Sequence, residues 1–223
     1  LPNGLMTLEA ISDKAYDPAT TEYALTQFKS IAFKLINYWG TASNDKSLNN
    51  KLPFYKQEIE KFINEISVAD FPMRLLWRDE LMQTTFERLL RKIKNRLGLK
   101  EKISKTRLIV SKTDLIVAAQ KMHDRMFMPN AGGRPILLDQ CGSGWNPIES
   151  TKYFSNCKVV LITRDPRDQF VEIKHYKNGG SVEGFVDWYK EMQEKLEVIN
   201  NSKILLIRFE DFVRKNEKFV KLI

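Results

Sequence analysis

Apolar residues in the first part of the chain recur every three or four positions, which is the spacing of an amphipathic helix. Asp17-Pro18 is a helix-start signal, an N-cap acid before a proline, and the apolar pattern that follows it runs to Gly40. A polar loop comes next, and a second helix is predicted from about Pro53 to Val68. A third, longer helix is predicted from Pro72 to Gly98.

One further helix is predicted in this half, from near Ser111 to a point before Pro129. The residues between Thr106 and Ser111 are compatible with a short strand instead, and a pattern over so few positions does not decide between the two. The first half of the chain is therefore predicted to be rich in helix.

From Gly132 onward the pattern changes to short, continuous apolar runs. Runs of this kind are typical of strands in a parallel sheet, which are buried on both faces. Helices that would connect such strands are predicted at about 146–154, 166–176 and 181–199. The expected fold is an α/β domain with a central parallel sheet, whose ligands would bind beyond the carboxyl ends of the strands. The three runs are Pro135–Leu138, Val159–Ile162 and Ile204–Ile207.

Length and composition indicate one folded domain over residues 1–223, which we expect to be incomplete at both ends. No apolar run approaches the ~18 residues of a membrane span, and the first residues lack the features of a secretory signal. Only two cysteines occur, Cys141 and Cys157, so there is neither a disulfide framework nor a metal-binding cysteine pattern. We expect a cytoplasmic protein without a metal.

The net charge of +8 favours an anionic partner without naming its class. The basic residues between Arg88 and Arg96 follow a helical pattern and are not interleaved with aromatic residues. We interpret them as a solvated helix face and expect no nucleic acid.

The most informative segment is Lys158 to Asp168, an apolar strand that leads directly into a helix start. Asp165 is the predicted N-cap, Pro166 the first helical residue, and Asp168 the acid that reaches back to the cap. Arg164 then lies at the carboxyl end of a strand and near a helix N-terminus, where an anion such as phosphate is favoured. The alternative is that Arg164 pairs only with Asp165 or Asp168.

The chain from Lys158 to Ile223 resembles the second half of sulfotransferases that use 3′-phosphoadenosine 5′-phosphosulfate (PAPS). Arg164–Asp168 and His175 are in register with the motif that binds the 3′-phosphate in that family. Phe185 and Trp188 resemble the Phe-x-x-Trp of its next helix, and Ile204–Phe212 resembles its strand and Tyr/Phe-Glu-Asp turn. The resemblance implies a P-loop-like, three-layer fold, PAPS as co-substrate, and contacts from Arg164 and Arg167 to the donor.

The sequence also departs from this family in two places. Glu172 occupies the position where many members place a serine on the 3′-phosphate, and its carboxylate repels phosphate unless it is protonated, turned away or paired, with Lys174 or Arg167 as candidate partners. The 5′-phosphosulfate loop has no counterpart in Leu1 to Leu8.

The resemblance also implies an acceptor side for the site. Residues from Ile136 to Pro147 occupy the place of the strand and loop that approach the sulfate. Asp139 is the nearest candidate catalytic base, and the alternative is that it braces the turn at Gly142–Gly144. Trp145 is the aromatic residue expected to border the acceptor. His123 and His175 are interpreted as packing or surface residues.

Three functions follow from this pattern. The first is transfer of a sulfuryl group from PAPS to a hydroxyl or amine of a small-molecule or carbohydrate acceptor. The second is a sulfotransferase-like domain that binds a nucleotide or an anionic polymer without catalysis, which Glu172 and the missing 5′-phosphosulfate loop suggest. The third is a basic helical interaction protein in which Arg164–Asp168 is merely a capped helix start. A parallel sheet with Arg164 at its carboxyl edge would exclude the third.

Overall fold

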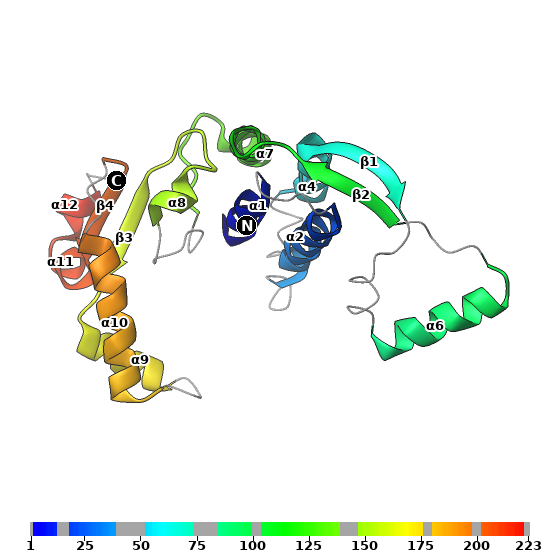
Figure 1. The fold of residues 1–223 in the computed structure, drawn as a ribbon. Helices are drawn as coiled ribbons and strands as arrows, with labels where there is room; N and C mark the ends of the chain where they lie inside the picture. The colour runs from blue at the N-terminus through cyan, green and yellow to red at the C-terminus, as the bar shows by residue number, and fades with distance from the viewer. Residues whose placement is uncertain are drawn as a thin grey trace. The chain divides into compact units, whose positions relative to one another are not determined.

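The structure is a computed structural model that describes residues 2–12, 18–38, 52–73, 84–99, 104–138, 147–175, 180–197 and 202–220. Its contacts divide the chain into two compact units, residues 3–137 and residues 138–223, whose elements are labelled in Figure 1. The single domain over 1–223 stays a prediction, because compact units defined by contacts can still belong to one cooperative domain.

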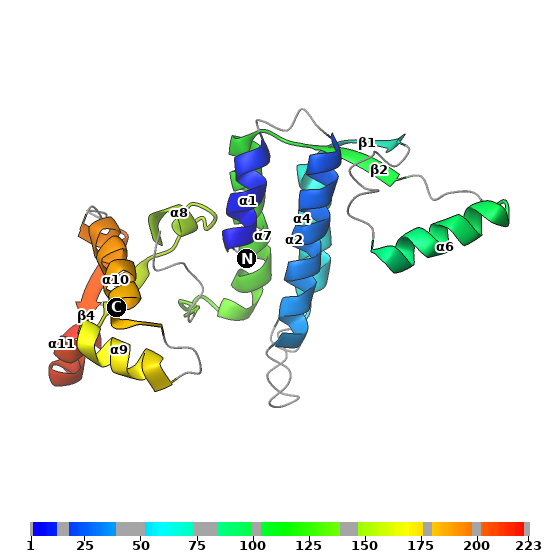
Figure 2. The same cartoon turned by 60° about the horizontal axis from the view of Figure 1, so that its bottom comes forward.

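The first unit is built around four helices that lie side by side in Figure 2. They are α1 (Pro2–Ser12), α2 (Pro18–Tyr38), α4 (Tyr55–Ile66) and α7 (Lys112–Ala131). Each contributes fully buried apolar side chains to a shared core, and the rings of Phe28 and Phe62 meet at 5.6 Å between centroids. The predicted helices at 18–40 and 53–68 correspond to α2 and α4. The buried residues of the four helices include Leu5, Leu8, Leu25, Phe28, Ile59, Phe62, Leu115 and Met122.

Charged side chains connect these helices around the core. Arg125 of α7 forms ion pairs with Glu58 and with Glu65 of α4, the second at 3.2 Å. Lys112 Nζ lies 2.7 Å from Glu9 Oε1 of α1, whose carboxylate is largely buried. Partial burial of Arg125 opposes its charge, but the hydrogen bonds and charges of the two glutamates outweigh it and raise the pKa of the guanidinium.

The first unit contains two strands. The sequence did not predict the first of them, and it left the second as an open alternative. β1 (Ser67–Met73) pairs antiparallel with β2 (Ser104–Ile109), with an irregularity between Ser67 and Ala69. The prediction that a helix begins at Pro72 is therefore wrong, because Pro72 lies opposite Lys105 in this ladder. The strand alternative for the segment before Ser111 is confirmed as far as Ile109. Pairing between distant segments, which leaves no local periodic signal, produced this sheet.

The remaining elements of the first unit begin and end with local signals. α6 (Thr85–Arg96) is the described part of the predicted helix from Pro72 to Gly98. α7 starts after Ser111, whose Oγ accepts the N–H of Asp114 at 3.3 Å, and ends at Gly132 in the left-handed conformation. The predicted end before Pro129 is wrong, because this proline lies within the last turn of α7.

The second unit has one parallel pair of strands and several short helices. β3 (Val159–Thr163) pairs with β4 (Ile204–Arg208), from Val159 opposite Ile204 to Thr163 opposite Arg208. The helices α9 (Pro166–His175) and α10 (Val182–Glu197) form the crossover between them, as predicted. The short helices are α8 (Pro147–Thr151), α11 (Phe209–Arg214) and α12 (Asn216–Val220).

The predicted strand at Pro135–Leu138 is not a strand in the structure, and the Leu137 side chain is 85% exposed. The mixed helical and strand architecture is thus established, while a P-loop-like three-layer sheet stays a prediction. In the described part of the chain, no helix combines the length and apolar character needed to cross a membrane. The same residues contain no cluster of three or more His, Cys, Asp or Glu arranged to hold a metal ion.

Candidate anion-binding site

The carboxyl ends of β3 and β4 bring two arginine-bearing turns to one edge of the second unit. Thr163 and Arg208 are paired at the end of the ladder, so Arg164 follows β3 where Phe209 follows β4. The Arg164 guanidinium carbon lies 5.3 Å from the centre of the Phe209 ring, a distance at which a cation is attracted to the ring face. Parallel pairing therefore determines where Arg164 sits.

Asp165 fixes the start of α9. Its Oδ1 accepts the backbone N–H of Arg167 at 2.9 Å, which confirms the predicted N-cap. The Arg167 side chain also donates to this carboxylate, through Nε at 3.0 Å and Nη2 at 2.7 Å. The side-chain bond from Arg167 and the backbone bond hold the pKa of Asp165 well below its usual range. The Arg167 side chain is exposed, but its guanidinium is therefore bound to Asp165.

Glu210 on α11 takes the role that the sequence predicted for Asp168. Glu210 Oε1 accepts the backbone N–H of Asp165 at 2.8 Å, so the N-cap is tied to the turn after β4. This bond, together with one to its own backbone, lowers the pKa of Glu210. The sequence signal for Glu210 was the Phe-Glu-Asp segment after the strand, but a contact over 45 positions has no local signature.

Arg164 is held by three helices. Its Nη1 pairs with Glu172 of α9, and its backbone carbonyl accepts a bond of 3.3 Å from the Tyr189 hydroxyl of α10. The Phe209 ring of α11 covers the guanidinium. Its Nε is buried and, among the described residues, has no hydrogen-bond partner.

These contacts correct two expectations from the sequence. The alternative in which Arg164 pairs only with Asp165 or Asp168 is not what the structure shows, because Glu172 is its ion-pair partner. The candidate partners of Glu172, Lys174 and Arg167, were also wrong. Glu172 lies about two helical turns beyond the cap, and its carboxylate reaches Arg164 at the end of β3.

Aromatic rings pack α10 against α9, the helix that carries Glu172. The Phe185 ring of α10 lies 5.2 Å from the Phe170 ring of α9, and it also contacts Trp188 and Tyr189 at 5.7 and 5.9 Å. The Phe185 ring therefore packs α10 against α9. This packing also positions the Tyr189 hydroxyl beside Arg164.

The balance of charge decides what this edge can bind. Arg164, Arg167 and Arg208 face the carboxylates of Asp165, Glu172 and Glu210, so most of the positive charge is already compensated. The carboxylates of Asp165 and Glu210 accept hydrogen bonds from backbone N–H groups and stabilise the start of α9. The Glu172 side chain is 56% exposed, so water reaches its ion pair with Arg164. An anion that replaced Glu172 would gain the Arg164 guanidinium, including its unpartnered Nε.

The other candidate residues do not join this edge. Asp139 and Trp145 lie outside the described residues, as do Cys141 and the Gly142–Gly144 turn. His175 is exposed at the far end of α9, and His123 is buried in the first unit with its ring stacked on Phe127.

Cys157 is half-buried, with its Sγ 3.6 Å from the Thr151 carbonyl oxygen. Burial raises the pKa of its thiol against the opposing charge of Lys203. A thiol of this kind is a poor nucleophile at neutral pH.

Comparisons with known proteins do not assign the chain to a family. No protein-family model matches the chain, and neither a curated protein nor a solved structure does. The assignment of a function therefore depends on the geometry at the carboxyl ends of β3 and β4 and on the residues from Arg164 to Glu172.

Proposed function

We propose that this chain is a sulfotransferase-like domain that binds the 3′-phosphoadenosine part of PAPS with Arg164. The observation that carries the proposal is the position of Arg164 after a parallel strand and before the capped start of α9, with Nε unpartnered. In parallel sheets this edge is where ligands bind, and a helix N-terminus adds partial positive charge for a phosphate.

The residues around Arg164 fit the 3′-phosphate half of the donor PAPS. Arg164 offers a guanidinium braced by Phe209 and Tyr189, and Asp165 and Glu210 hold the turn that orients it. Residues 2–8 do not support the 5′-phosphosulfate half, because they form part of α1 rather than a loop after a strand. PAPS, when bound, would supply the sulfuryl group that is transferred to the acceptor.

The acceptor side of the proposal rests on sequence alone. Asp139 is proposed as the base that takes the proton of the attacking hydroxyl or amine, and Trp145 as a wall of the acceptor pocket. Arg167 is proposed as a secondary contact to the donor, which requires it to leave Asp165 in part. A small-molecule or carbohydrate acceptor fits this scheme.

Glu172 favours a second candidate, a non-catalytic domain that binds a nucleotide or an anionic polymer. Its carboxylate neutralises the very guanidinium that a donor phosphate would need. The third candidate, a helical interaction protein, is disfavoured by the parallel pairing of β3 with β4, which leaves Arg164 at the carboxyl edge of a sheet.

The test is calorimetric titration with adenosine 3′,5′-bisphosphate at fixed salt. We expect the wild-type chain to bind, Arg164→Ala to lose binding, and Arg214→Ala to retain it. Arg214 is a matched control because it is exposed at the end of α11 and removes the same charge. No binding by a folded wild-type chain would contradict the proposal.

Catalysis requires a separate measurement. Release of adenosine 3′,5′-bisphosphate from PAPS, followed with phenol, sugar and amine acceptors, distinguishes the enzyme from the non-catalytic domain. Arg164-dependent binding without release would support the second candidate.

A further inference from the structure

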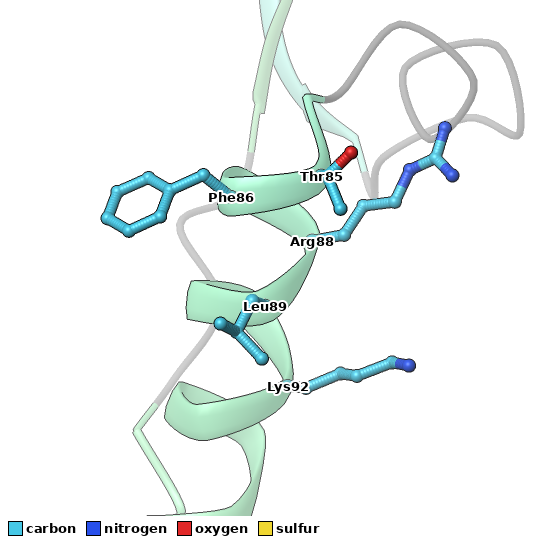
Figure 3. Close-up of a pocket in the computed structure, with 5 residues that line it drawn as sticks. All are labelled: Thr85, Phe86, Arg88, Leu89 and Lys92. Carbon is cyan, nitrogen blue, oxygen red and sulfur yellow. The ribbon is translucent and has the colours of Figure 1, made fainter.

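α6 has two chemically distinct sides. Phe86, Leu89, Leu90 and Ile93 recur at helical spacing and Leu97 follows on the same line, so their side chains form one apolar stripe. All five are exposed, from 39% for Leu90 to 68% for Phe86 and Leu97. Figure 3 shows Phe86 extending to one side of the helix, with Arg88 and Lys92 extending to the other.

The rest of the helix surface is strongly basic. Five cations accompany a single carboxylate, that of Glu87. At 3.6 residues per turn, Lys94 falls along one edge of the apolar stripe, and Lys92 and Arg96 fall along the other. The apolar stripe is therefore bordered by positive charge on both of its long edges. The cations are Arg88, Arg91, Lys92, Lys94 and Arg96.

Local bonds start this helix, and its apolar stripe is exposed. Thr84 Oγ1 accepts the N–H of Glu87 at 3.3 Å, and Glu87 Oε2 accepts the N–H of Thr84 at 2.8 Å, a complete capping box. Within the described residues, α6 buries none of its side chains. A helix of this length without tertiary packing is only marginally stable in water, so α6 gains stability from whatever covers its apolar stripe.

Among the described residues, only α6 contributes side chains to the hollow beside it. These side chains, drawn in Figure 3, are Thr85, Phe86, Arg88, Leu89 and Lys92. The described residues therefore offer no opposing wall to a small molecule. An extended partner surface fits the stripe better than a ligand.

We propose that α6 binds an anionic lipid surface, lying parallel to it with the apolar stripe at the boundary between headgroups and acyl chains. Apolar side chains of this size gain free energy by leaving water, and lysines and arginines at the stripe edges extend to the headgroups. Each cation near such a surface adds electrostatic attraction. The helix has 12 residues, fewer than the ~20 that span a bilayer, so it would lie on the membrane rather than cross it.

Charge separates this occupant from a second copy of the chain. Two α6 helices in contact along their stripes would bring like charges together at both edges, which is unfavourable. The remaining rival is an acidic protein groove, and the experiment below includes it.

The test is sedimentation of the full chain with vesicles of phosphatidylcholine alone or mixed with phosphatidylserine. We expect binding to the mixed vesicles only, weakening as salt is raised. Lys92→Glu combined with Lys94→Glu should weaken binding by about tenfold or more. The matched control is Lys34→Glu with Lys61→Glu, two exposed lysines of α2 and α4 that change the net charge by the same amount.

The apolar stripe is tested in the same way. Leu89→Asn with Ile93→Asn should weaken binding by about tenfold or more, whereas Val182→Asn with Val186→Asn on exposed positions of α10 should not. Circular dichroism of each variant checks that it is folded. An increase in helical signal when wild-type chain meets mixed vesicles would support the proposal.

Three outcomes would overturn it. One is no binding of the wild-type chain to mixed vesicles, and another is an equal loss of binding in the α6 and control lysine pairs. The third is vesicle binding that survives in the α6 variants while binding to an acidic amphipathic peptide, or dimer formation in sedimentation velocity, is lost. That result would make α6 a protein-docking surface.

Discussion

Arg164 and Glu172 are the residues on which the proposed anion binding depends. Their ion pair is partly exposed, so it contributes little to stability and can exchange with a stronger anion. Asp165 was predictable as an N-cap because the signal is contained in neighbouring residues. The pairing of Arg164 with Glu172 was not, because it requires the strand end and the second turn of α9 to meet.

Replacing Glu172 should therefore strengthen donor binding. We expect Glu172→Gln to bind adenosine 3′,5′-bisphosphate several-fold more tightly, because the competing carboxylate is removed from Arg164. Titration calorimetry against wild type measures the change. Glu183→Gln, which removes one carboxylate from the first turn of α10, is the control. Weaker binding in Glu172→Gln would mean that Glu172 positions Arg164 rather than competing for it.

The helix start of α9 predicts how stability depends on pH. Because the folded pKa of Asp165 is lowered, its ion pair with Arg167 stabilises the fold above the unfolded pKa of about 3.9 and is lost as pH falls through the folded value. Glu210 contributes in the same direction. The melting temperature should therefore fall as pH is lowered below about 5.

Asp165→Asn is the variant that isolates this charge. Asparagine is also a good N-cap, so α9 should keep its start while losing the charge on the cap. We expect a smaller fall of the melting temperature in acid than in wild type, measured by thermal unfolding at several pH values. Asp187→Asn, an exposed change on α10, should follow the wild-type curve. A steeper fall in Asp165→Asn would contradict the assignment.

The ion pairs between α4 and α7 predict that removing Arg125 lowers the stability of the fold. Arg125→Ala leaves Glu58, with a side chain only 16% exposed, without its cation. We expect a loss of about 2 kcal/mol in the free energy of unfolding, measured in urea. A double-mutant cycle with Glu58→Gln should show coupling between the two positions. Lys121→Ala, on an exposed position of α7, serves as the control, and an equal loss there would contradict the pairing.

Helices and strands were predictable where the sequence pattern that indicates them lies within neighbouring residues. β3, β4, α9 and α10 lie where apolar runs and helix-start residues placed them, within a few positions. β1 was missed because its residues follow no strand pattern and are extended only through pairing with β2. Pro135–Leu138 gave the opposite error, because an apolar run without a neighbouring strand does not form one in the structure.

At the scale of the whole molecule, the core of the first unit should dominate stability. Phe62 is fully buried against Phe28, and Phe62→Ala should cost about 3–5 kcal/mol because it leaves a cavity. Hydrogen exchange should rise in α2, α4 and α7, and unchanged exchange there would contradict this packing. An equal rise in β3 and β4 would support the single cooperative domain predicted over residues 1–223.

The sequence by itself determined the helix-rich first half, the two parallel strands with their crossover helices, the capped start of α9 and the position of Arg164 at a strand end. These features follow from periodicity and capping, which act over a few neighbouring residues. Tertiary structure decided the partner of Arg164, the role of Glu210, the pairing of β1 with β2 and the exposure of the α6 stripe. Each of these depends on residues far apart in the chain, and such contacts form only when the fold brings them together.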